Sequence, residues 1–67
     1  MDRIERRRYQ ILQRIAAAGR FISSAEIASA LKISAKTVRL DIAALSEQMS
    51  QYGIHILKKT GQGYCMD

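Results

Sequence analysis

The sequence has no proline, no tryptophan and a single cysteine among its 67 residues. A lone cysteine cannot form an internal disulfide, and such a composition suits a reducing compartment, so we expect a cytoplasmic protein. Cys65 and His55 are the only side chains of their kinds, which excludes a zinc site built from cysteine and histidine. No nucleophile, base and orienting group are assembled, so we expect no enzyme, no cofactor and no metal.

Long apolar runs are also missing. No stretch of about 18 or more apolar residues occurs, as a membrane-spanning helix would require. The charged first ten residues lack the apolar centre of a secretory signal. Positive charge is abundant instead, with 11 Lys+Arg against 6 Asp+Glu, a net charge of +5 and a pI of about 9.9. A pI above about 9 is typical of domains that bind nucleic acid.

The first half of the chain has the periodicity of a helix followed by a short extended segment. Residues 2–18 predict a helix that begins at the N-cap Asp2 and ends at Gly19. Residues 20–22 are too short for a helix and predict a short strand. Ile4, Ile11, Leu12 and Ile15 lie on one apolar stripe of the first helix. Because Arg8 stands where this stripe would continue, we expect the first two turns to be less buried.

Two further helices follow in close succession, over residues 24–31 and about 35–51. Ser23 and Glu26 have the S-x-x-E spacing of a capping box, in which the serine and the glutamate each accept a backbone N–H of the other. Ser34 is the predicted N-cap of the third helix. Because only two or three residues separate these helices, they predict a helix-turn-helix unit. Their predicted core residues are Ile27, Ala28, Leu31, Val38, Ile42, Leu45 and Met49.

After Gly53 the apolar residues alternate, and the segment KTGQG carries two glycines. This pattern predicts a β-hairpin over residues 54–67. The expected fold is therefore mainly α with a small β-hairpin, a winged helix-turn-helix with three helices, a short strand after the first helix and a two-stranded wing. Residues 1–67 would form one DNA-binding domain, which we expect to be the N-terminal part of a longer protein.

This layout suits double-stranded DNA, because a helix fits a major groove about 12 Å wide and its N-terminal residues reach base edges. We expect residues 35–51 to enter the groove and the hairpin to contact the backbone or minor groove. Leu40 points away from the predicted core, where it would meet thymine methyl groups or, alternatively, another protein domain. The candidate DNA-binding residues are Ser34, Ala35, Lys36, Thr37, Arg39, Leu40, Ala43, Lys58, Lys59 and Arg7.

Two charged positions have competing interpretations. Arg7 belongs to the ERRR run at residues 5–8, which indicates either phosphate contact or a solvated helix face. Asp41 lies beside the predicted core face of the third helix. We expect it to pair with a nearby cation or with Thr37.

The segment LKISAKTVRLDIAALSEQMSQYGIHILKKTGQGYCM resembles the N-terminal winged-helix domain of bacterial sugar-system transcription regulators. These regulators carry phosphotransferase-system regulation domains and are related to the Bgl-type antiterminators and the mannitol and lichenan activators. The resemblance covers nearly the whole chain. The pattern S-x-x-T-[VI]-R-x-D-[IL]-x-x-L is met by Ser34, Thr37, Val38, Arg39, Asp41, Ile42 and Leu45, and the wing pattern by Gly53, Ile54, Ile56, Gly61, Gly63 and Tyr64.

The resemblance implies a homodimeric regulator that binds the operator of a sugar uptake or utilisation operon. Phosphotransferase-system proteins would act on domains outside this chain. DeoR-type and WYL-domain regulators and the biotin-ligase repressor share parts of these motifs and are alternatives. The longer segment SEQMSQY favours the phosphotransferase-linked group. Leu40 departs from the pattern, since the superfamily often has a second basic residue there.

Overall fold

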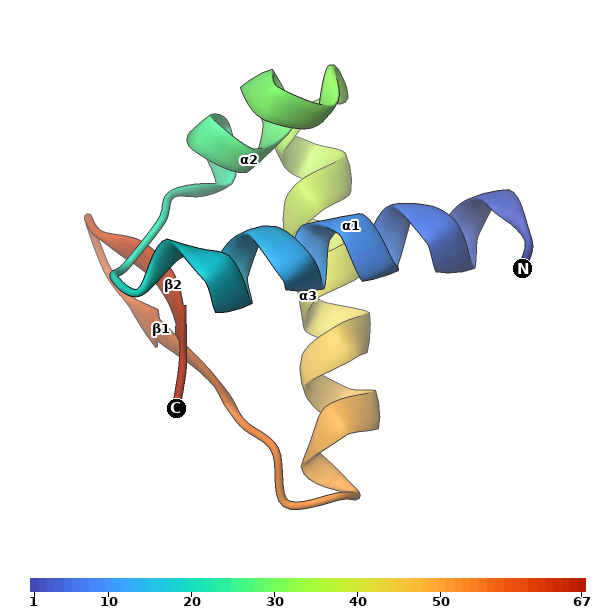
Figure 1. The fold of residues 1–67 in the computed structure, drawn as a ribbon. Coiled ribbons are helices and arrows are strands. Elements are labelled where there is room, and N and C mark those ends of the chain that lie inside the picture. Colours follow the sequence, from blue (N-terminus) through green and yellow to red (C-terminus); the bar gives the residue numbers. More distant parts are fainter.

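The computed structural model describes residues 1–67 and contains three helices followed by a two-stranded antiparallel sheet (Figure 1). The helices cross one another, with α1 in front of α3 and α2 beside one end of α3, while the hairpin lies at one side of the bundle (Figure 1). This arrangement confirms the predicted winged helix-turn-helix. The elements are α1 (Arg3–Ala18), α2 (Ser24–Leu31), α3 (Ala35–Ser50), β1 (Ile56–Lys59) and β2 (Gly63–Met66).

Each helix begins directly after its predicted N-cap residue. The side-chain oxygen of this residue accepts a hydrogen bond from the backbone N–H three positions later, which satisfies one of the free donors of the first turn. The donor–acceptor distances are 2.7 Å at Asp2, 3.0 Å at Ser23 and 3.0 Å at Ser34. Gly19 ends α1 in the left-handed region with φ +64°, also as predicted.

Two local predictions, one before α2 and one in its first turn, are corrected by the structure. The carboxylate of Glu26 does not complete a capping box, because it accepts instead from the Arg20 guanidinium at 3.1 Å. Residues 20–22 do not form a full strand. Only Ile22 pairs, through two 2.8 Å backbone hydrogen bonds with Tyr64 of β2. This bridge fastens the wing to the segment between α1 and α2.

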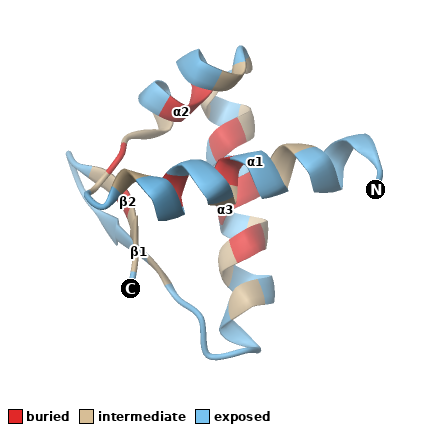
Figure 2. Ribbon diagram, viewed as in Figure 1, coloured by how far each residue is buried: buried red, intermediate tan, exposed pale blue.

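Nine buried apolar side chains from all parts of the fold form one core. Figure 2 shows the buried positions of the helices turned toward the point where they meet. Ile4 is 48% exposed, as expected for the less buried first two turns, because these turns of α1 extend beyond α3 (Figure 1). Leu12, Leu31 and Met49 are only half-buried. The core residues are Ile11, Ile15, Ile22, Ile27, Ala28, Val38, Ile42, Leu45 and Tyr64.

The turn between α2 and α3 contains an unpredicted left-handed residue. Lys32 has φ +58° and is the only residue other than glycine with a positive φ. Its backbone N–H and that of Ile33 both donate to the carbonyl oxygen of Ala28, the latter at 3.0 Å. This conformation reverses the chain within three residues and brings the half-buried Ile33 against the core.

The wing has a defined register, in which Lys58 pairs with Tyr64 and Lys59 with Gly63. Gly63 has φ +106°, and a Cβ there would lie 2.1 Å from the carbonyl oxygen of Ile22. Only glycine allows the hairpin to approach the Ile22 backbone so closely.

Candidate nucleic-acid interface

The outer face of α3 is open to solvent. Lys36, Arg39, Leu40 and Ala43 are all exposed, and Leu40, at 62%, is the only large apolar side chain of α3 that is exposed. The prediction that Leu40 points away from the core is therefore confirmed.

Charge is unevenly distributed along this face. Lys36 and Arg39 lie in the first turns of α3, and the only outward carboxylate, Glu47, lies in its later half. Recognition helices contact base edges mainly through their N-terminal residues. The positive part of the face therefore coincides with the part of a recognition helix that enters the groove.

Ser34 caps the start of α3 through two hydrogen bonds with Thr37. The Ser34 hydroxyl accepts from the Thr37 N–H and donates to the Thr37 hydroxyl oxygen at 2.8 Å. Ser34 is exposed, whereas Thr37 and Ala35 are half-buried and Ala35 packs against the core. The remaining N–H groups of this first turn and the helix dipole favour an anion such as phosphate.

Arg7, one of the predicted DNA-binding residues, has a partner inside the chain. Its Nη2 donates to Oδ1 of Asp41 at 2.9 Å, and its Nε donates to Oδ2 of the same carboxylate. Arg8 adds a third hydrogen bond, from Nε to Oδ1 at 3.1 Å. The expected pairing of Asp41 with a nearby cation is therefore confirmed. The two interpretations of the ERRR run, phosphate contact and a solvated helix face, did not anticipate that Arg7 would be the partner of Asp41.

This ion pair lies where α1 crosses α3. The Asp41 side chain is 2% exposed, while those of Arg7 and Arg8 are 27% and 31% exposed. The hydrogen bonds from Arg7 lower the pKa of Asp41 and raise the pKa of Arg7. The pair therefore contributes to the packing of α1 on α3, and much of the hydrogen-bonding capacity of Arg7 is used within the fold.

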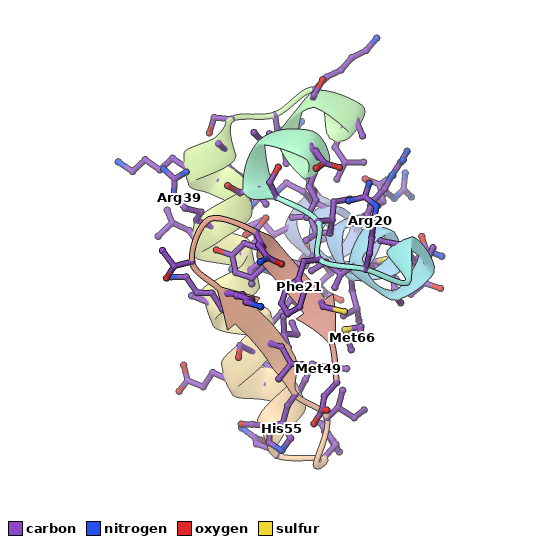
Figure 3. All side chains as sticks on the ribbon, turned by 90° about the vertical axis from the view of Figure 1, so that its left-hand side faces the viewer. Arg20, Phe21, Arg39, Met49, His55 and Met66 are labelled. Atoms are coloured by element: carbon purple, nitrogen blue, oxygen red, sulfur yellow. The ribbon has the colours of Figure 1, made fainter.

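The two lysines of the wing have different surroundings. Lys58 lines a cleft of about 210 Å³ between α3 and the wing, opposite Arg39. The Nζ of Lys59 lies 5.9 Å from the centre of the Phe21 ring. Figure 3 shows Arg39 extending from α3 into solvent and Phe21 beside the wing.

Four residues that line this cleft are not among the candidate DNA-binding residues. Ser46 and Tyr64 line it, together with the apolar Ile42 and Ile56. Ser46 follows Arg39 by two helical turns, a spacing that places both on one side of α3. That spacing was a usable signal, whereas the position of Tyr64 depends on how the wing packs.

None of the three helices combines the length and the hydropathy needed to cross a membrane. No three or more His, Cys, Asp or Glu side chains come together as possible metal ligands.

Comparison with known proteins gives one informative match. The model of a protein family described as an HTH (helix-turn-helix) domain matches residues 7–65. The matched range contains α2, α3 and β1 completely, together with most of α1 and β2. No curated protein and no solved structure matches the chain significantly.

Proposed function

The chain belongs to the helix-turn-helix domain family of DNA-binding transcription regulator domains, and we propose that it recognises a specific double-stranded operator by placing α3 in the major groove. The observation that carries this proposal is the exposed face of α3, where Lys36 and Arg39 lie beside an uncharged surface and no carboxylate intervenes before Glu47.

The side chains on this face match what a groove offers. Lys36 and Arg39 supply donors for guanine acceptors or phosphate oxygens. Ala43 keeps the helix slim, and Leu40 offers an apolar surface to thymine methyl groups. Lys58 lies at one side of α3, where the sugar-phosphate backbone borders the groove.

The regulated genes are proposed to belong to a sugar uptake or utilisation operon, and residues 1–67 to be the N-terminal part of the regulator. The support is the motif from Ser34 to Leu45 and the wing pattern that ends in Tyr64. We propose a homodimer, since paired helix-turn-helix domains bind half-sites about 34 Å apart. Phosphotransferase-system proteins would act through other domains. A DeoR-type, WYL-type or biotin-ligase continuation of the native gene would identify a different branch.

The test begins with selection of bound fragments from a duplex library, followed by band shifts with the selected sequence. Lys36→Ala and Arg39→Ala should each weaken binding by about 5- to 150-fold, since a good base contact or a hydrogen bond to a charged phosphate contributes about 1–3 kcal/mol. Arg14→Ala is the matched control, because Arg14 is exposed on α1 and should change affinity less than about 2-fold. If both α3 variants bind as tightly as the wild type, α3 is not the recognition helix.

The exposure of Leu40 favours one alternative of a different class, a winged helix that docks another protein through this face. Salt dependence separates the two functions. DNA binding that releases several counterions falls steeply as salt rises, whereas docking of an apolar face responds little.

A further inference from the structure

We propose that the cleft between α3 and the wing holds a single backbone phosphate of the bound duplex, gripped jointly by Arg39 and Lys58. The proposal rests on the DNA-binding function above and deepens it, because it assigns one phosphodiester group to one place on the protein.

The two cations come from different elements. Arg39 belongs to α3 and Lys58 to β1, and both line the same cleft of about 210 Å³. No aspartate or glutamate lines it. Neither cation takes part in an ion pair of the chain, since the three pairs involve Arg7, Arg8 and Arg20. Two unpaired positive charges without a neighbouring carboxylate attract an anion.

Two hydroxyl groups complete the cleft. Ser46 lines it from α3, and Tyr64 lies opposite Lys58 in the register of the hairpin. Tyr64 as a whole is largely buried, and its hydroxyl makes no hydrogen bond within the chain. Every fully buried side-chain oxygen or nitrogen of the protein has a hydrogen-bond partner, so the unpartnered Tyr64 hydroxyl is not one of the fully buried atoms. The Tyr64 hydroxyl therefore keeps contact with solvent. It can donate to an anion in the cleft.

The chemistry of the cleft fits a phosphodiester group. Its unesterified oxygens can accept charge-assisted hydrogen bonds from a guanidinium, an ammonium and hydroxyl groups. The apolar Ile42 and Ile56 reduce the water around these contacts, which strengthens them. The cleft also flanks the outer face of α3, where a helix in the major groove meets the phosphates that border it.

Lys59 provides an internal contrast. It follows Lys58 directly, but it does not line this cleft and its ammonium group lies over the Phe21 ring. We therefore assign the single phosphate to Lys58 and not to Lys59. Arg39 then positions the duplex, while Lys36 contacts a base.

The experiment uses the selected duplex with methylphosphonate at one phosphate at a time, which removes the charge at that position. For the wild type, methylphosphonate at one position should weaken binding by about 10-fold, because the uncharged group loses its attraction to Arg39 and Lys58. At that same position the Arg39→Ala/Lys58→Ala double variant should lose less than about 2-fold. Lys59→Ala, the matched control, should keep the 10-fold sensitivity. Circular dichroism melting checks that the variants fold.

Other outcomes overturn the proposal in distinguishable ways. If Arg39→Ala and Lys58→Ala abolish sensitivity at different phosphates, or at none, the cleft does not hold one phosphate, while DNA binding stands. If inorganic phosphate alone saturates the amide signals of Ser46 and Tyr64 below millimolar concentration, the cleft is a small-anion site. If the wild type binds no duplex, both this proposal and the proposed function fail.

Discussion

The guanidinium of Arg7 and the carboxylate of Asp41 form a two-pronged ion pair across 34 positions of the chain. The pair joins the N-terminal half of α1 to the middle of α3, and Arg8 donates to the same carboxylate. Because Asp41 lies between the outward Leu40 and the buried Ile42, the pair helps determine which face of α3 remains exposed.

The substitution Asp41→Asn should lower the free energy of unfolding at pH 7 by about 1.5–3 kcal/mol, because hydrogen bonds to charged groups contribute that amount. The loss stays within this range because the partly exposed side chains of Arg7 and Arg8 can be solvated in the variant. Urea denaturation measures the change. Glu47→Gln is the control, since Glu47 is exposed and belongs to no ion pair. Equal stability of the two variants would contradict a stabilising role for the pair.

The same pair predicts a dependence on pH. The pKa of Asp41 is lowered by folding, so its contribution is present above its ordinary unfolded pKa of about 3.9 and is lost as pH falls through the folded value. Between about pH 5 and pH 2 the wild type should therefore lose more stability than Asp41→Asn. Parallel loss in the two proteins would show that Asp41 does not respond to acid in this way.

Replacing Gly63 by alanine should destabilise the fold by about 3 kcal/mol, because the new Cβ would meet the Ile22 carbonyl oxygen at 2.1 Å and the backbone has a positive φ. Gly61→Ala is a close control. Gly61 also has a positive φ, at +80°, but nothing lies within 4 Å, so it should cost only about 1 kcal/mol. Urea denaturation measures the free energy of unfolding, and amide exchange at Ile22 and Tyr64 reports on the contact between the wing and Ile22. Similar losses of stability for Gly63→Ala and Gly61→Ala would rule out the steric explanation.

Lys32→Gly should raise stability by about 0.5–1 kcal/mol. A left-handed conformation costs a residue with a side chain about 1–2 kcal/mol, and the greater freedom of glycine in the unfolded chain offsets part of the gain. The melting temperature should rise by about 4 °C. Lys32→Ala removes the charge but keeps the unfavourable φ, and if it stabilises as much as Lys32→Gly, backbone strain is not the cause.

Leu40 should make binding depend on thymine methyl groups. Replacing the contacted thymine of the selected duplex by uracil removes one methyl, worth about 0.8 kcal/mol, and should weaken wild-type binding about 4-fold. Leu40→Ala should bind the two duplexes almost equally. Fluorescence anisotropy at fixed salt measures the ratio. A Leu40→Ala protein that still discriminates would show that another side chain contacts the methyl.

Much of the local structure follows from short-range patterns. The N-caps at Asp2, Ser23 and Ser34, the stop at Gly19 and the outward direction of Leu40 were predictable, because each depends on residues within one or two turns. The capping box at Glu26 failed because a residue outside the helix, Arg20, competes for the same carboxylate. The left-handed Lys32 was not predictable, since the type of residue gives no sign of it.

By itself, the sequence determined the three helices, the hairpin, their order and a net positive charge, because helical and strand periodicities and helix caps act locally along the chain. Tertiary structure alone decided which positive charges remain available. Arg7 is held by a carboxylate from another helix, and Lys59 lies over an aromatic ring, while Arg39 and Lys58 line one cleft that no carboxylate lines. The physical reason is that a charge interacts mainly with the groups that lie within a few ångströms of it, and distant segments become neighbours only when the chain folds.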